Sequence, residues 1–389
     1  MRRALLLVAV SVLGVLLLGA TASASTTGFF NGPLPMHQGR GYFTATKLLN
    51  GNVLVAGGWG FDMKTTFPPP ASLATSEIYH WRTGTWSSAA TMREARAAAS
   101  AVRLPAGRVL VAGGMDLAGN TTATAEIYNP NKNTWTTTGS LHTARFEDVP
   151  AVLLPAGRVL VTGGFSNTAF PTPAVLASTE IWHPLTGKWT LGESMHVARG
   201  EFATVVLKNG RVLVTGGVSA AGTPLDSAEI YNPSTGHWKL IAPMNTARAD
   251  EAAVLLHDGR VLVAGGSVAS GDRTTSCEIY NPRTGKWTAT GSLSAGRSES
   301  EYAIVRLRDG RILLAGGYTG TPDAQGNSQD LNTAEVYNPK TGTWALVANT
   351  MSASRSGHAV VLLPGNAGVL VMGGVNNGLA TPTVDVFHY

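Results

Sequence analysis

Arginine recurs along this chain at intervals of 49 to 58 residues, and acidic side chains follow it at a fixed spacing in part of the sequence. The arginines are Arg40, Arg96, Arg145, Arg199, Arg248, Arg297 and Arg355. In four consecutive units a carboxylate stands two residues later, at Glu147, Glu201, Asp250 and Glu299. Further acids are Asp148, Glu251 and Glu301, and Tyr302 follows the last of them. Such groups could bind a polar ligand or a cation, or could supply an acid and a base to a reaction.

The arginines also have a purely structural interpretation. One salt bridge per unit, formed between neighbouring units by the arginine and the repeated acid of the Glu-Ile-Tyr type segment, would then serve packing. The extra carboxylates do not follow the repeat, because Tyr42, Ala98 and Gly357 stand at that position elsewhere. We therefore predict a binding site without catalytic residues or metal ligands, made of Arg145, Glu147, Arg199, Glu201, Arg248, Asp250, Glu251, Arg297, Glu299 and Tyr302.

The elements that must position these residues repeat with the same period. A double glycine closes an apolar run seven times, at residues 57–58, 113–114, 163–164, 216–217, 265–266, 316–317 and 373–374. Before it the sequence predicts a β-hairpin, clearest over residues 151–164. After it come a variable loop, a Glu-Ile-Tyr type strand, a turn and a tryptophan strand, as in Glu229 to Trp238.

A sheet of four short antiparallel strands cannot bury both of its apolar faces alone. When such sheets pack radially, each one covers the faces of its two neighbours. The arginine, the double glycine, the spaced tyrosine and the tryptophan together resemble the Kelch repeat over essentially the whole mature chain. The expected fold is therefore all-β: a seven-bladed β-propeller of Kelch repeats with four antiparallel strands per blade.

The two ends of the chain predict how the ring closes. The last unit stops at Tyr389 after a third strand and lacks its tryptophan strand. Near the other end, Thr27-Gly28-Phe29-Phe30 matches the Thr-Gly-x-Trp of Thr235 to Trp238. We expect residues around Thr27 to Asn31 to complete the last blade, which would leave no gap between the first and last blades.

The up-and-down order of strands also assigns the loops to faces. The entry to each blade and the loop between its second and third strands must emerge together. These loops differ between blades, for example over residues 59–76, 165–179 and 318–334, whereas the opposite face has uniform turns such as Asp258-Gly259. Variable loops on a rigid scaffold favour binding on the first face.

The N-terminus predicts a secretory signal peptide. Arg2 and Arg3 precede an apolar run to Leu18, and small residues lead to a cleavage site after Ala24. We therefore expect a signal peptide over residues 1–24, a single propeller domain over residues 25–389, and a secreted protein. An uncleaved membrane anchor is the alternative. The single cysteine, Cys277, excludes an intramolecular disulfide.

Charge and composition narrow the partners. Without the two leader arginines the chain has 27 basic and 24 acidic residues, a net charge of +3, and no basic run suggests nucleic-acid binding. The expected partner is an extracellular carbohydrate or a protein segment. We expect the mature protein to be a monomer that needs no cofactor and is not attached to a membrane. Oxygen-rich residues from Asp323 to Asp330 leave calcium binding open, although their spacing matches no calcium loop.

Enzymatic alternatives come from the resemblance. Galactose oxidase and the sialic acid mutarotases also carry Kelch propellers, which implies a carbohydrate-active enzyme as the second function, with catalysis at the same face. A copper radical site would resemble two tyrosines, two histidines and a cysteine linked to one tyrosine. Cys277 instead occupies a position filled by small residues in other repeats, and His37, His142, His196 and His358 are scattered one per unit. A binding protein is the preferred interpretation.

Overall fold

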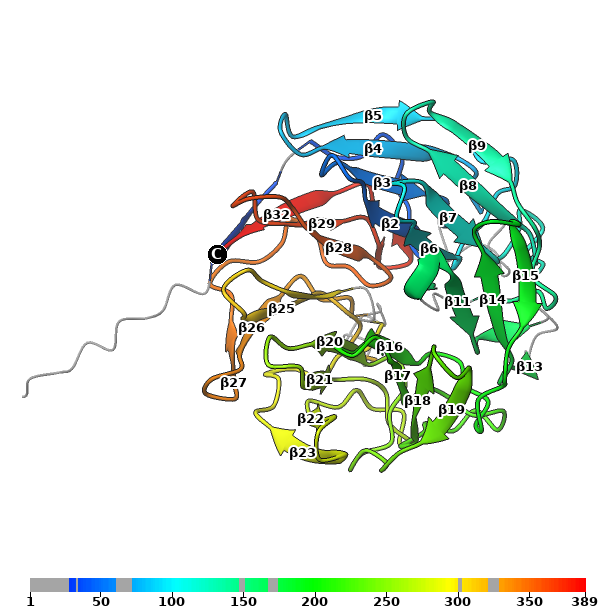
Figure 1. Ribbon diagram of the computed structural model, residues 1–389. Helices are drawn as coiled ribbons and strands as arrows, with labels where there is room; N and C mark the ends of the chain where they lie inside the picture. The colour runs from blue at the N-terminus through cyan, green and yellow to red at the C-terminus, as the bar shows by residue number, and fades with distance from the viewer. Residues whose placement is uncertain are drawn as a thin grey trace, which may run out of the picture.

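The protein is a ring of seven small antiparallel sheets (Figure 1). The computed structural model describes residues 28–32, 34–60, 72–146, 151–166, 174–299, 303–320 and 329–389. Each sheet has four strands, and the first strands of neighbouring sheets contact one another around the axis. The fourth strands lie at the periphery. The predicted seven-bladed propeller of four-stranded antiparallel blades is confirmed.

Six blades follow the order of the chain from the inside outward. Blade 1 is β2 (Thr44–Lys47), β3 (Val53–Ala56), β4 (Ser76–His80) and β5 (Thr85–Ala89). Blade 2 is β6 (Ser100–Arg103), β7 (Val109–Ala112), β8 (Ala125–Asn129) and β9 (Thr134–Thr137). Blade 3 is β10 (Val152–Leu153), β11 (Val159–Thr162), β14 (Thr179–His183) and β15 (Lys188–Leu191). Blade 4 is β16 (Ala203–Val206), β17 (Val212–Thr215), β18 (Ala228–Asn232) and β19 (His237–Leu240).

The remaining blades contain the later repeats and the joined ends of the chain. Blade 5 is β20 (Ala252–Leu255), β21 (Val261–Ala264), β22 (Cys277–Asn281) and β23 (Lys286–Thr290). Blade 6 is β24 (Ile304–Arg306), β25 (Ile312–Ala315), β26 (Ala334–Asn338) and β27 (Thr343–Leu346). Blade 7 is β28 (Ala359–Leu362), β29 (Val369–Met372), β32 (Val384–His388) and β1 (Phe29–Asn31). The loops add two small hairpins and one 3₁₀ turn: β12 (Phe165–Ser166) with β13 (Ala174–Val175), β30 (Val375–Asn376) with β31 (Leu379–Ala380), and η1 (Pro155–Gly157).

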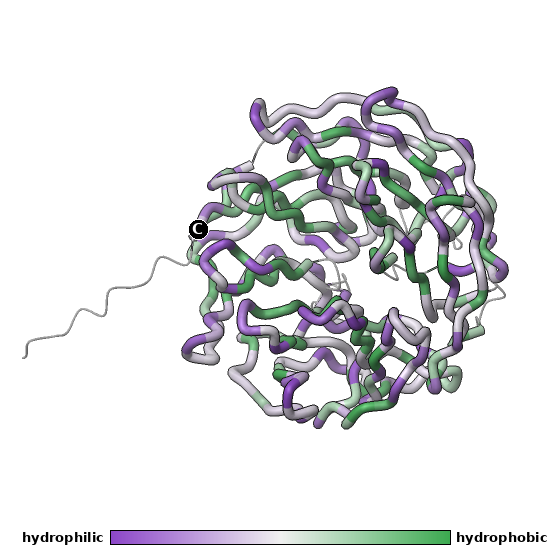
Figure 2. Tube along the Cα trace, in the orientation of Figure 1, coloured by the Kyte–Doolittle hydropathy of each residue, from purple (hydrophilic) through white to green (hydrophobic). Residues whose placement is uncertain are grey.

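The core lies between the blades. The second strand of every blade has all four residues buried, as in Val212–Thr215, because both faces of the strand are apolar or small. Hydrophobic residues of each pair of neighbouring blades form one buried cluster, including the pair formed by blades 7 and 1. Figure 2 shows these apolar strands inside the ring and hydrophilic turns at its edges. Burial between blades therefore stabilises a ring without disulfides.

The double glycines allow one blade to contact the next. Both glycines of every pair have positive φ, as at Gly57 (70°) and Gly58 (94°), a region that disfavours side chains. The amide of Gly58 donates to the carbonyl of Arg96 at 2.9 Å, and Arg96 opens the following blade. A Cβ at Gly57 would overlap the same carbonyl oxygen. The glycines are therefore needed for close backbone approach between blades.

The chain ends close the ring as predicted. Strand β1 pairs with β32 and places Phe30 opposite Phe387, with ring centroids 5.2 Å apart. In blade 4 the equivalent pair is Tyr231 and Trp238, at 5.1 Å. Phe30 therefore takes the place of the repeated tryptophan. The predicted signal peptide, its cleavage site and the start of the domain at residue 25 lie outside the described residues, and among those described no helix is long and apolar enough to span a membrane.

Candidate functional site

Each blade has one buried arginine–carboxylate pair just before its innermost strand. The arginine donates to the acid of the third strand in the same blade, so the acid of the Glu-Ile-Tyr type strand is the partner. The N···O distances lie between 2.6 and 3.3 Å for Arg40–Glu77, Arg96–Glu126, Arg145–Glu180, Arg199–Glu229, Arg248–Glu278, Arg297–Glu335 and Arg355–Asp385. These pairs recur seven times because they are part of the repeat.

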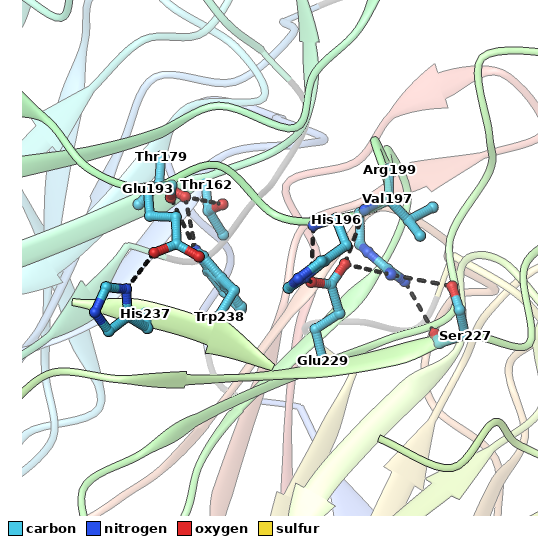
Figure 3. A network of polar contacts seen from close by, with 10 residues as sticks. All are labelled: Thr162, Thr179, Glu193, His196, Val197, Arg199, Ser227, Glu229, His237 and Trp238. Carbon is cyan, nitrogen blue, oxygen red and sulfur yellow. Dashed lines mark hydrogen bonds and ion pairs between the residues drawn. The ribbon is translucent and has the colours of Figure 1, made fainter. Parts of the chain in front are cut away.

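The pair in blade 4 shows the hydrogen bonds that hold these groups (Figure 3). Nη1 of Arg199 donates to the carbonyls of Gly216 and Ser227, and Nη2 donates to the Ser227 hydroxyl and to Glu229. Glu229 also accepts from the amides of His196 and Val197 and contacts Nδ1 of His196. Burial lowers the pKa of Arg199, and the Glu229 carboxylate opposes this effect. The network holds the entry of the chain against the third strand.

The structure places the predicted arginines inside the protein and not on the channel mouth. Side chains of Arg145, Arg199, Arg248 and Arg297 are between 0% and 3% exposed. The ion pair is formed within one blade, contrary to the expected bridge between blades. The link to the preceding blade is made by the arginine carbonyl, as in the bond from Gly164 N to Arg199 O. These arginines therefore position the neighbouring acidic residues and do not line a surface.

The described residues two positions after the arginines lie at the mouth of the channel, on the loop-bearing face. They share a left-handed backbone, with φ between 48° and 54°: Tyr42, Ala98, Glu201, Asp250, Glu299 and Gly357. Three neighbouring pairs are joined through the backbone: Asp250 N donates to Glu201 O at 2.9 Å, Tyr42 N to Gly357 O at 2.8 Å and Ala98 N to Tyr42 O at 2.9 Å. Glu299 lies within electrostatic reach of Glu201. Three consecutive blades therefore bring Glu201, Asp250 and Glu299 together.

Tyr42 connects the ring across a blade. Its hydroxyl donates to Oε2 of Glu299 at 2.6 Å, so a side chain of blade 1 reaches the entry of blade 6. A Cβ at Gly357, in the intervening blade 7, would lie 2.7 Å from the Tyr42 ring. The absence of a side chain at Gly357 leaves space for this contact. The other side of Tyr42 packs on Trp59, with centroids 4.7 Å apart.

The three carboxylates influence one another. Burial raises the pKa of Glu201 to about 8, Asp250 and Glu299 add to this effect, and Arg273 opposes it. Glu201 is therefore mainly protonated at neutral pH and can donate as well as accept a hydrogen bond. The site combines a neutral carboxyl with acidic neighbours and one nearby guanidinium.

Arg273 adds a cation and an aromatic surface to the site. It lies in the loop after β21, where its Nε donates to the Ser298 hydroxyl at 3.0 Å and its guanidinium stacks over Tyr318 at 5.0 Å. These contacts fix a loop of blade 5 on blade 6. We call the resulting set the loop-face rim, defined as Tyr42, Trp59, Glu201, Asp250, Arg273, Glu299 and Tyr318.

Only part of this rim follows from the sequence prediction. Glu201, Asp250 and Glu299 were predicted and lie together. Glu251 was predicted as well, but it is fully buried against Gly216 between blades 4 and 5. Glu147 and Tyr302, together with Asp148 and Glu301, lie outside the described residues, as do residues 323–328 of the possible calcium loop.

Sequence reasoning missed Tyr42, Trp59, Arg273 and Tyr318. A signal was present for three of them. Tyr42 occupies the carboxylate position of its repeat, and Trp59 and Tyr318 each directly follow a double glycine. Arg273 gave no signal because it belongs to a loop without a repeated pattern. Its role depends on how that loop folds back onto blade 6.

The residues considered for a copper site have other positions. Cys277 is buried in β22, and burial raises the pKa of its thiol to about 11. His142 and His196 contact the structural acids Glu180 and Glu229. His358 is buried between blades 6 and 7. Within the described ranges, no three His, Cys, Asp or Glu side chains are grouped as metal ligands would be.

Comparison with known proteins agrees with this geometry. The Kelch motif model matches residues 96–142, 199–245, 250–294 and 307–351. The chain is therefore a seven-bladed β-propeller that carries Kelch motifs. No curated protein matches it in sequence.

Solved structures share its fold. A copper complex described as a novel fungal alcohol oxidase of the AA5 family superposes with a TM-score of 0.72 at 18% identity, covering 93% of this chain and 76% of the oxidase. YjhT superposes with a TM-score of 0.61 at 16% identity, covering 80% of this chain and 98% of YjhT. At these identities the likeness concerns the architecture.

Proposed function

We propose that the protein is a secreted binding module that holds a carbohydrate on the loop-face rim. The observation that carries this proposal is the convergence of Glu201, Asp250 and Glu299 with aromatic rings at one mouth of the channel. This convergence is specific to a few blades, whereas the structural arginine pairs occur in all seven. Secretion is part of the proposal and rests on the leader-like N-terminus.

The rim offers the groups that sugars need. Carboxylates accept hydrogen bonds from sugar hydroxyl groups, and a hydrogen bond to an ionised carboxylate is stronger than one between neutral groups. A protonated Glu201 can donate to a ring or carbonyl oxygen. The rings of Trp59 and Tyr318 supply flat apolar surfaces for the C–H faces of a sugar, and a few polar groups beside aromatic surface are typical of ligand sites.

A basic protein segment is the second candidate ligand. The grouping of three carboxylates favours it, because an acidic rim attracts Lys and Arg side chains. Only Arg273 offsets these acids among the rim residues. A peptide ligand should depend strongly on salt, whereas a neutral sugar should not.

A carbohydrate-active enzyme is the alternative function at this rim. The raised pKa of Glu201 favours it, because a protonated carboxyl beside other carboxylates is the arrangement used for acid–base catalysis. Copper chemistry of the kind named for the fungal alcohol oxidase does not fit the described residues. Cys277 is enclosed between blades 5 and 6, and Tyr280 packs on Trp287 at 4.9 Å.

A glycan array followed by calorimetry tests the proposal. The purified protein should retain a defined class of saccharide, and Glu299→Gln should weaken binding of that saccharide by about tenfold, the cost of one charge-assisted hydrogen bond. Glu193→Gln is the control, since Glu193 contacts His237 at the outer strands of blades 3 and 4 (Figure 3). Binding of basic peptides alone would favour the second ligand, and turnover of the bound saccharide would establish the enzyme. The site would be rejected if the array gave no signal and calorimetry with basic peptides showed equal binding by the wild type and Glu299→Gln.

A further inference from the structure

The opposite face of the propeller contains a cleft that the proposed function does not use. The cleft has a volume of about 750 Å³ and lies over blades 5 and 6. Its walls are turns and the strand ends beside them: His257 and Asp258 between β20 and β21, residues 306–311 from the last residue of β24 to the start of β25, and residues 338–340 from the last residue of β26 into the following turn. This volume is within the range of small-molecule sites. What the cleft can bind depends on the side chains that line it.

Cations of the cleft outnumber its anions. Asp258 pairs with Arg260 and Asp309 pairs with Arg311, each at 2.7 Å, so both acids of the lining are neutralised. Within the described part of the chain, no ion pair joins the three remaining cations to a carboxylate. These cations are Arg306, Arg308 and Lys340. The described lining of the cleft therefore has more cationic than anionic side chains.

Two of these cations are already held in place. Nη1 of Arg306 donates to the carbonyl of Leu255 in blade 5 at 3.1 Å. Nη2 of Arg308 donates to the carbonyl of Leu363 in blade 7 at 3.1 Å. Each bond uses one donor and leaves further N–H groups of the guanidinium for another partner. Because these side chains are already ordered, binding an anion would cost less side-chain conformational entropy.

The positive field extends toward the channel. Lys47 ends the innermost strand of blade 1, and its Nζ donates to the carbonyl of Leu362, which also lines the cleft. Burial lowers the pKa of Lys47, and Arg308 and Arg103 add to this effect, so these cations lie within electrostatic reach of one another. Strand β24 begins after Glu299 at the loop face and ends at Arg306 at the turn face.

We propose that this cleft binds a small molecule with two or more anionic groups, phosphate or carboxylate, which Arg306 and Arg308 engage with paired N–H groups and Lys340 with its ammonium. Planar guanidinium groups match both kinds of oxyanion. The site is separate from the loop-face rim, so its ligand and that of the rim do not compete.

Calorimetry with pyrophosphate and with citrate at low ionic strength tests this proposal and distinguishes the two kinds of oxyanion. Saturable binding of at least one of them is expected, with about tenfold weaker binding in Lys340→Gln and in Arg308→Gln. Lys340 is exposed and its side chain has no protein partner among the contacts described, so its variant should fold normally. Arg108→Gln is the control, because Arg108 is exposed on the same kind of turn in blade 2, outside the cleft. No heat with either anion at millimolar concentration would overturn the proposal, as would an equal loss in Arg108→Gln.

Discussion

The hydroxyl of Tyr42 in blade 1 donates to Oε2 of Glu299 in blade 6 at 2.6 Å, which joins two blades that are not neighbours. Blade 7 lies between them, and Gly357 is the residue over which the tyrosine passes. The contact links the entries of two blades within the loop-face rim. Its loss should therefore affect both the stability of the ring and the shape of the rim.

A double-mutant cycle on Tyr42 and Glu299 measures this contact. Tyr42→Phe keeps the ring on Trp59 and removes the hydroxyl, so we expect a loss of about 1.5–3 kcal/mol in unfolding free energy, the value of a hydrogen bond to a charged group. In the Glu299→Gln background the same change should cost clearly less. Urea denaturation gives the four values. Equal costs in both backgrounds would mean that the two side chains are energetically independent.

Gly357→Ala tests the passage of Tyr42 over blade 7. The new methyl group would lie 2.7 Å from the Tyr42 ring and displace it, with an expected loss of about 1–3 kcal/mol beyond the cost of the backbone conformation. Gly365→Ala is the matched control, because Gly365 has φ 55° against 53° and open space around it. Thermal unfolding of both variants should show the larger drop for Gly357→Ala; similar drops would rule out the steric explanation.

Arg199→Met should be strongly destabilising. It leaves the buried carboxylate of Glu229 with its amide donors and without its cation, and breaking a buried ion pair from one side costs about 3–5 kcal/mol. Denaturant unfolding provides the value. The exposed pair of Glu193 and His237 offers the contrast, since Glu193→Gln should leave the transition midpoint almost unchanged. A mild effect of Arg199→Met would show that the pair is not needed in each blade.

Glu251 should make stability decrease as pH rises. Burial raises its pKa from 4.5 to about 8, against the opposing effect of Arg248. Between these values the folded state binds the proton more tightly than the unfolded state, so unfolding free energy falls with rising pH and levels off above about 8. Glu251→Gln should reduce this slope and stabilise the protein at pH 8 by a few kcal/mol, on the order expected for such a shift. Because the pKa of Glu201 is raised as well, the Glu251→Gln variant should keep a smaller decrease of stability with rising pH. Parallel curves of melting temperature against pH for wild type and variant would contradict this assignment.

His358 should act with the opposite sign. Burial, with help from Arg355, lowers its pKa from 6.5 to about 3, so the unfolded state takes up the proton first. Stability attributable to this group is present above about 6.5 and is lost as pH falls toward 3. His358 packs against Gly316 as Phe43 packs against Gly373. His358→Phe should therefore raise the melting temperature at pH 5 more than at pH 8, and an equal gain at both values would exclude titration as the cause.

Local and repeated features were the ones that could be predicted. The double glycines and the Tyr–Trp pairs recur once per blade, and Phe30 stands at the position of a repeated tryptophan. The spacing of these residues was therefore sufficient to predict the fold and the closure of the ring. The acid partner of each arginine was also predicted. The burial of that pair was not, because it depends on carbonyls of two other segments, such as Gly216 and Ser227, that surround the guanidinium.

The candidate sites depend on relationships that the repeat does not encode. Tyr42 reaches Glu299 only because the ring brings residues 257 positions apart to the same mouth and because Gly357 is small. The turns of the opposite face are uniform in sequence, as at Asp258-Gly259. The cleft over blades 5 and 6 depends on how two turns of blade 6, which carry Arg306, Arg308 and Lys340, lie beside the His257–Asp258 turn of blade 5, and a repeat pattern does not encode that arrangement.

The pairing of β1 with β32 also bears on how this molecule folds. Each of the first six blades is assembled from one continuous stretch of chain, so it can form as soon as that stretch is available. Blade 7 must bring together Asn31 and His388, which are 357 positions apart. The entropic penalty of such a closure grows only with the logarithm of the intervening length, yet distant contacts of this kind slow folding. We therefore expect the pairing of the three-residue strand β1 with β32 to be the slowest step of folding, because it joins the two ends of the described chain.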